Sequence, residues 1–188
     1  MKKIWLLAIC LGISSLAAAQ SAKERKQNIR EAESACGDPR ADFFVGQSQD
    51  SPASPPIESG KARVYIIEED QHQSDLSNSM TFVGMDGKWI GATTGNSYIT
   101  FSVDPGKHHL CAQFHLSYAG RVTSLSELTA TANQTYYFRA TVFRGYNFNI
   151  FNLEPVYPDE GKLMMTESAP AVFTETWKKK KIHGKRNP

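Results

Sequence analysis

From Ala62 onward the chain alternates short runs rich in Val, Ile, Tyr, Phe and Thr with clusters of Gly, Pro, Asn and Asp. β-branched and aromatic side chains favour strands, whereas the residue types between the runs favour turns. The runs are too short for amphipathic helices. The pattern therefore predicts strands over residues 62–68, 80–85, 88–93, 97–103, 107–116, 122–131, 135–143 and 148–154.

Three of the turns have an explicit chemistry. Met85-Asp86-Gly87-Lys88 contains an Asp-Gly pair, which accepts positive φ at both central positions of a two-residue hairpin loop. In Asp104-Pro105-Gly106 the proline fixes φ and the glycine accepts a left-handed conformation. Ala132-Asn133-Gln134 predicts a third reversal.

The distance between reversals constrains the fold class. Reversals recur about every seven to twelve residues, which is typical of antiparallel sandwiches and barrels rather than of parallel α/β sheets. We therefore predict an all-β fold over residues 61–168, an antiparallel β-sandwich that is immunoglobulin-like or carboxypeptidase-regulatory-like. After Pro155, residues 158–167 predict a short helix in which Leu163 and Met164 cover an open end of the sandwich.

Alternation within two strands assigns side chains to faces. In the strand at 107–116 one face is apolar and the other carries His109, Cys111, Gln113 and His115. In the strand at 135–143, Tyr137 lies opposite the apolar face. The predicted core positions of these two strands are Leu110, Ala112, Phe114, Tyr136, Phe138, Ala140 and Val142.

The N-terminus has the organisation of a secretory signal peptide over residues 1–19. Lys2 and Lys3 precede the apolar run Ile4–Ile13, and Ala17-Ala18-Ala19 supplies a small-residue cleavage site. The run is shorter than the ~20 apolar residues of a membrane-spanning helix. We expect an exported protein, periplasmic or secreted, with lipid anchoring at Cys10 as the alternative; the bulky Ile9 before that cysteine argues against the anchor.

The remaining ends of the chain differ from the strand-rich region. Residues 20–60 predict a short charged helix near 21–35 followed by a loop rich in Ser and Pro. Residues 169–188 predict a disordered basic tail, because Lys178, Lys179, Lys180 and Lys181 have few apolar neighbours with which to fold.

The charge distribution narrows the partners that we expect. Residues 178–188 contain six basic residues and no acidic one, whereas residues 20–177 contain 13 basic and 19 acidic residues. A mildly acidic body lacks the basic surface of a nucleic-acid-binding protein. The tail alone predicts contact with an anionic membrane or surface polymer, and it is equally typical of a segment that only aids solubility.

Two cysteines remain after the signal peptide is removed, Cys36 and Cys111. In an oxidising compartment such a pair predicts a single disulfide, and two buried free thiols are the alternative.

Several segments together resemble a known family. They are Lys61-Ala62-Arg63-Val64-Tyr65, the stretch from Val83 to Gly91, Asn96-Ser97-Tyr98, Asp104-Pro105-Gly106-Lys107-His108-His109, Thr135-Tyr136-Tyr137-Phe138-Arg139 and Asp159-Glu160-Gly161-Lys162. Their order and spacing resemble the bacterial domain-of-unknown-function family 2846, over about residues 60–168, and a similar rhythm occurs in PEGA-type surface modules. The resemblance implies a small exported or lipid-anchored envelope protein with a β-sandwich fold and no assigned activity.

No motif predicts a metal or a cofactor. His109 and His115 share a strand face with Cys111, but six residues of extended strand separate the histidines by about 20 Å. We therefore expect no metal site and no bound cofactor.

No motif predicts a catalytic nucleophile or an acid–base pair. Ser102, Ser117 and Ser124 lack a nucleophile elbow or a placed base. The acidic runs Glu68-Glu69-Asp70 and Asp159-Glu160 have the sequence context of solvated groups at a strand end and a helix start.

Aromatic residues crowd the hairpin from residue 135 to 151. On its polar face, Tyr137, Arg139, Asn147 and Asn149 are candidates for a shelf that binds a glycan or peptide, and ordinary cross-strand pairing is the alternative.

These observations favour a non-enzymatic envelope module with an interaction or structural role, whose partner is an envelope protein, a glycan or a peptide. The alternatives are a hydrolase whose site is assembled from loops, and a tether that binds lipid or surface polymer through Lys178–Lys181.

Overall fold

The predicted strands from Ala62 onward are present in the computed structural model. The structure describes residues 36–48, 56–69, 80–116, 120–144 and 149–177, which belong to one compact unit. Its strands are β1 (Ala41–Gln47), β2 (Ala62–Glu68), β3 (Met80–Met85), β4 (Lys88–Thr93), β5 (Ser97–Val103), β6 (Gly106–Leu116), β7 (Gly120–Ala130), β8 (Thr135–Arg144), β9 (Asn149–Val156) and β10 (Ala169–Trp177), and its helix is α2 (Pro158–Thr166).

The described strands form two sheets. One has the order β1-β10-β5-β2-β8-β9 and the other has the order β4-β3-β6-β7. Most neighbours are antiparallel, but β2 pairs with β8 and β5 pairs with β10 in parallel. The prediction of a purely antiparallel arrangement was therefore wrong for two pairs, because β8 and β10 join the first sheet only after long connections that allow either direction.

The turns have the backbone conformations that their residues predict. Asp86 and Gly87 both have positive φ, 51° and 82°, and join β3 to β4 in a tight hairpin. Gly106 has φ of 137°, and Asn133 has φ of 62° between β7 and β8. The three reversals predicted from sequence are confirmed.

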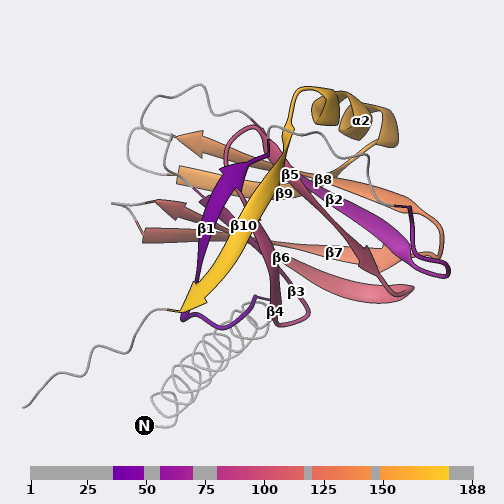
Figure 1. Ribbon diagram of the computed structural model, residues 1–188, viewed down its shortest axis with the longest axis horizontal. Helices are drawn as coiled ribbons and strands as arrows, with labels where there is room; N and C mark the ends of the chain where they lie inside the picture. The colour runs from indigo at the N-terminus through magenta and orange to yellow at the C-terminus, as the bar shows by residue number, and fades with distance from the viewer. Residues whose placement is uncertain (1–35, 49–55, 70–79, 117–119, 145–148, 178–188) are drawn as a thin grey trace, which may run out of the picture. The chain divides into compact units, whose positions relative to one another are not determined.

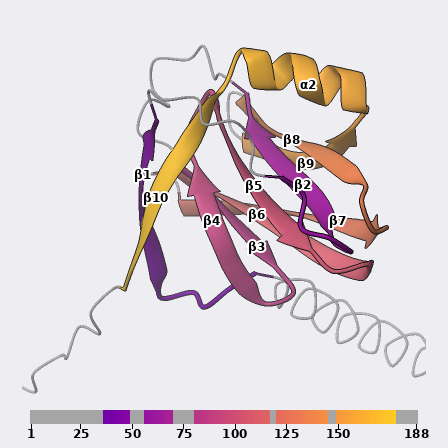
Figure 2. The same ribbon diagram turned by 45° about the vertical axis from the view of Figure 1, so that its right-hand side comes forward.

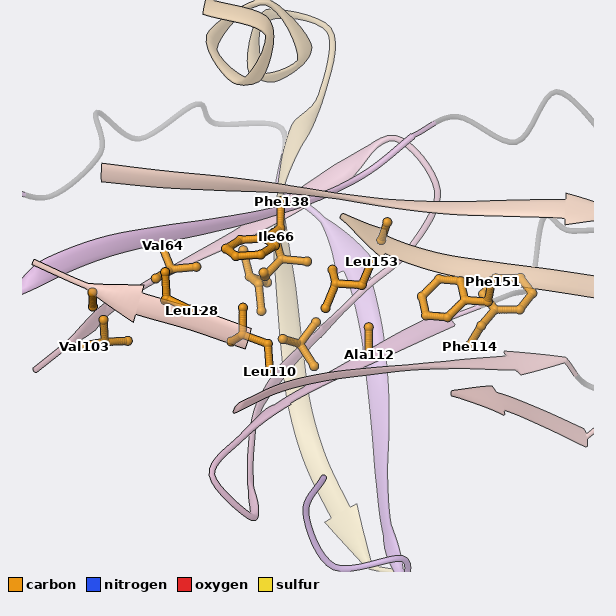
Figure 3. Packing of buried hydrophobic residues seen from close by; sticks show 14 of the residues in the cluster. Val64, Ile66, Val103, Leu110, Ala112, Phe114, Leu128, Phe138, Phe151 and Leu153 are labelled. Atoms are coloured by element: carbon orange, nitrogen blue, oxygen red, sulfur yellow. The ribbon is translucent and has the colours of Figure 1, made fainter. Parts of the chain in front are cut away.

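A shared apolar core lies between the two sheets (Figure 3). The inner face of β2 contributes Val64 and Ile66, and β6 contributes Leu110, Ala112 and Phe114, all fully buried. The ring of Phe114 stacks on that of Phe151 with 5.6 Å between the centroids. The assignment of faces in β6 and β8 is confirmed, since the predicted apolar positions line this core.

Helix α2 covers the outer face of the six-stranded sheet, over β2 and β8 (Figure 1). Pro158 and two acidic residues occupy its first turn, which suits the free N–H groups there. Met164 packs on a layer of tyrosines on this face, and Leu163 is exposed. The helix at 158–167 is confirmed, but it lies on a sheet face and does not close an open end with Leu163 as predicted.

β1 and β10 form a two-stranded ribbon that runs across the other strands, as Figures 1 and 2 show from two sides. The register runs from Ala41 opposite Trp177 to Gln47 opposite Ala171. We call β1 and β10 the ribbon, and β2 to β9 the body. The expected boundaries of 61 and 168 therefore omit two strands, and residues 169–177 are not tail. The ribbon joins the first and the last of the described strands, a pairing that no local pattern reveals.

Several expectations lie outside the described residues. They are the signal peptide, the helix near 21–35, residues 49–55 of the loop before residue 61, and the lysines of the tail, Lys178, Lys179, Lys180 and Lys181. Within the described part of the chain, no helix has the length and apolarity needed to cross a membrane.

Candidate functional site

The predicted disulfide is present. Cys36 and Cys111 are bonded, with 5.2 Å between their Cα atoms and 75 positions between them in the sequence. Cys111 projects from β6 on the side opposite the main core, and its side chain is fully buried against Cys36 and Trp89. The bond therefore fixes the segment that precedes β1 to the outer face of the four-stranded sheet.

Trp89 of β4 holds the same segment by a second set of contacts. Its indole Nε1 donates a hydrogen bond of 2.8 Å to the carbonyl oxygen of Asp38. Gly37 lies so close to the indole that a side chain at position 37 would overlap it. The disulfide and Trp89 together hold the segment that leads into the ribbon, and we call these two sets of contacts the clasp.

The two faces of the ribbon have different environments. On the inner face, Phe43 contacts Phe82 edge-on, at 4.7 Å between centroids, and also Trp89. On the outer face, Phe44 is 74% exposed and Val172 is 57% exposed. Phe44 pairs with Thr174, two residues from Val172, so the two apolar side chains are diagonal neighbours. β1 is also an edge strand of its sheet.

The far end of the ribbon is attached to the body through the turn between β4 and β5. The backbone N–H of Ala169 donates to the carbonyl oxygen of Asn96 at 3.1 Å, and Gln47 Nε2 donates to that of Gly95 at 2.7 Å. Ser97 closes the turn, because its Oγ donates to the carbonyl oxygen of Thr94. β10 and β5 themselves pair at only two positions.

A buried carboxyl lies beside this attachment. Glu68 continues the inward-facing series of β2 and is fully buried between the sheets, where Thr93 Oγ1 donates to Glu68 Oε2 at 2.6 Å. Glu68 Oε1 makes no hydrogen bond to a described residue. Burial raises the pKa of Glu68 to about 7, although the hydroxyls of Thr93 and Thr81 favour the ionised form. The expectation of a solvated Glu68 was wrong.

His108 and Asp86 form a clamp between two turns. His108 Nδ1 donates to Asp86 Oδ2 at 2.7 Å, and Nε2 donates to the carbonyl oxygen of Asp104 at 2.8 Å. Burial lowers the pKa of His108, but these hydrogen bonds and the two aspartate charges raise it overall. An imidazolium with both N–H groups engaged cannot act as a general base.

The residues of the predicted ligand shelf do not share one environment. Tyr137 is only 8% exposed because α2 covers it, and Gly161 contacts its ring. Arg139 Nε donates to Glu154 Oε1 and Nη1 donates to Glu160 Oε1, each at 3.0 Å. Asn147 lies outside the described residues, and of Asn149 only the backbone pairing in β9 is described. The structure therefore places Tyr137 and Arg139 in a packed layer beneath α2, not on an open surface.

The other candidate residues have structural roles. Ser124 Oγ accepts a hydrogen bond from the backbone N–H of Leu153, and Ser102 bonds Glu58. The ring of His115 lies against Phe82, Cys111 is in the disulfide, and His109 is exposed. Ser117 lies outside the described residues. No group of three or more His, Cys, Asp or Glu side chains within the described ranges is arranged to hold a metal ion.

Sequence reasoning missed the outer face of the ribbon and the buried carboxyl. The outer face had a local signal: Ala41, Phe43 and Val45 form one apolar face of a strand, and the large apolar Phe44 falls on the other face beside Asp42.

Comparison of the chain with family models, with curated proteins and with solved structures gave no match in any of the three.

Proposed function

We propose that this protein is an exported β-sandwich of the bacterial cell envelope that works as a binding or structural module and not as an enzyme. The resemblance to family 2846 and the signal-like N-terminus support the location. The parallel pairing of β2 with β8 departs from the antiparallel immunoglobulin-like arrangement, so a sandwich of mixed topology is the form that we propose.

The observation that carries the proposal is the buried bond between Cys36 and Cys111. Structural disulfides persist in oxidising compartments and are rare in a reducing cytosol. The bond also connects the segment before the ribbon to the body, so its presence is part of the architecture.

The chemistry of the described residues supports binding over catalysis. His108 has both ring nitrogens in hydrogen bonds, Arg139 is paired with carboxylates, and Glu68 has no exposed surface. By contrast, Phe44 and Val172 expose apolar surface on the ribbon. An exposed apolar pair on an edge ribbon suits a protein partner that packs on the outer face.

Export and oxidation can be tested together by cell fractionation followed by alkylation of free thiols in denaturant. We expect the mature chain in the envelope or medium, with no thiol modified until a reductant is added. The matched control is Cys36→Ser, which leaves Cys111 open to modification. A cytosolic protein with two modifiable thiols would overturn the proposal.

The binding surface can be tested by placing a photoreactive phenylalanine analogue at Phe44 or Val172 in living cells. We expect a crosslinked product of one defined mass at both positions. Tyr157, directly after β9, is the matched control, because it is aromatic and 79% exposed and β9 lies at the opposite end of the sheet from β1. Equal crosslinking at Tyr157, or none at the ribbon, would contradict an outer-face partner.

A further inference from the structure

The attachment of the ribbon and the buried carboxyl are neighbours in the sheet. Ser97 of β5 is the register partner of Glu68 on one side and of Ala169 on the other. Thr93, whose hydroxyl binds Glu68, immediately precedes the turn that holds the ribbon through Asn96 and Gly95. The carboxyl and the ribbon are therefore connected through one short turn.

The surroundings of Glu68 suit a neutral acid and not a carboxylate. Facing it are Thr81 of β3, Thr93 of β4, Ser97 of β5 and Ala140 of β8. All four are fully buried, and Ser97 directs its hydroxyl to the turn. No charged side chain among the described residues contributes to its titration. Glu69 and Arg139 pair with each other on the opposite face of the sheet.

A buried carboxylate that has hydroxyl donors but no cation is costly, because burial removes its hydration. The cost disappears if the carboxylate gains contact with water. The most direct route is to separate β2 from Thr93 and the turn that follows it. The two-position pairing between β5 and β10 lies directly beside that contact, through Ser97.

We propose that Glu68 is a pH-sensitive latch: the protonated carboxyl holds the turn that anchors the ribbon, and its ionisation releases the far end of the ribbon from the body. The near end stays attached through the disulfide and Trp89. Release changes the geometry of the ribbon without unfolding the body. The latch is independent of whether the ribbon binds a partner.

The direction of the pH effect follows from linkage. The pKa of Glu68 is about 7 when the latch is closed and returns toward 4.5 when water reaches the carboxyl. Closure is therefore favoured fully below about pH 4.5, weakens as pH rises, and stops weakening above about pH 7. One pKa unit corresponds to a tenfold change in the opening equilibrium, so about a seventyfold increase in opening is expected between pH 5 and pH 8.

Amide hydrogen exchange measures this opening strand by strand, after correction for the intrinsic effect of pH on exchange. In the wild-type chain we expect the amides of β10 and β1 to lose about seventyfold in protection between pH 5 and pH 8. The amides of β7, in the other sheet, should change by much less. A loss of the same size in β7 would indicate global destabilisation and overturn the latch.

Two variants test whether Glu68 is the titrating group. Glu68→Gln preserves the shape of the neutral acid, so ribbon protection should become independent of pH over this range. Thr93→Val keeps the carboxyl but removes a donor that favours ionisation, so the pH at which protection stops falling should move upward. Glu127→Gln, an exposed acid on β7, is the matched control and should behave as wild type. An unchanged pH dependence in Glu68→Gln would overturn the proposal.

Discussion

The body and the ribbon are built from similar strands but are held in different ways. Each body strand has a long ladder to a neighbour, and every body strand except β4 contributes to the main core; β6 and β7, for example, pair along their whole length. The ribbon has one long ladder, between β1 and β10, and is otherwise held by a clasp at one end, a turn at the other and the packing of Phe43 on Phe82 between them. Stability in the body is therefore distributed over several ladders, whereas the ribbon is held to the body at three places.

The largest effect is expected from a change in the core of the body. Phe114→Ala removes a fully buried ring that stacks on Phe151, and should lower the free energy of unfolding by about 4 kcal/mol. Denaturation by urea measures the loss. Phe44→Ala is the matched control, because Phe44 is 74% exposed, and it should leave the midpoint nearly unchanged. Similar losses in both variants would contradict the distinction between body and ribbon.

Loss of the disulfide should affect the ribbon first. The double substitution Cys36→Ser with Cys111→Ser should lower the free energy of unfolding by about 3 kcal/mol, since a bond with 75 positions between its cysteines strongly restricts the unfolded chain. Hydrogen exchange should show the greatest loss of protection in β1. Uniform loss in all strands would mean that the clasp stabilises the whole domain and not the ribbon entry.

A substitution in α2 tests the packing of the helix that directly precedes β10. Gly161→Ala should favour α2 locally, but the added methyl group would overlap the ring of Tyr137. We expect a net loss of about 2 kcal/mol, because the helix must move from the sheet. Asp159→Ala is the control in the same helix turn. A gain in thermal stability in Gly161→Ala would show that the contact yields without cost.

The smallest effect is expected at the turn clamp of the body. The attraction between His108 and Asp86 requires both groups to be charged. It is complete between about pH 3.8 and pH 6.5, and it is lost as pH rises through the raised pKa of His108. It is also lost in acid, as pH falls through the lowered pKa of Asp86. His108→Gln should cost below about 1 kcal/mol. An NMR titration in which His108 titrates below pH 6.5 would contradict the clamp.

The strands of the body could be predicted from sequence because their signals are local. The alternation of Leu110, Ala112 and Phe114, and the positive φ at Asp86 and Gly87, depend on near neighbours alone. The ribbon was missed because its strands pair across almost the whole chain and stand next to segments rich in Pro, Ser or Lys. The parallel pairing of β2 with β8 was missed for the same reason.

The buried carboxyl was missed although its signal was present. Glu68 and Glu69 are adjacent acids, and composition alone treats them alike. The alternation of Ala62, Val64 and Ile66 already placed Glu68 on the inner face and Glu69 on the outer face. The disulfide could be predicted because only two cysteines, Cys36 and Cys111, lie beyond residue 19.

The register of the ribbon also sets an order of events during synthesis. β1 is among the first strands to be made, yet its only partner among the described strands is β10, the last. The pairing of Ala41 must therefore wait until Trp177 has been made, and the backbone of β1 has no strand partner during that interval. A chain that ends prematurely after α2 would keep most of its core but carry an unpaired, aromatic strand, and unpaired strands of this kind promote aggregation.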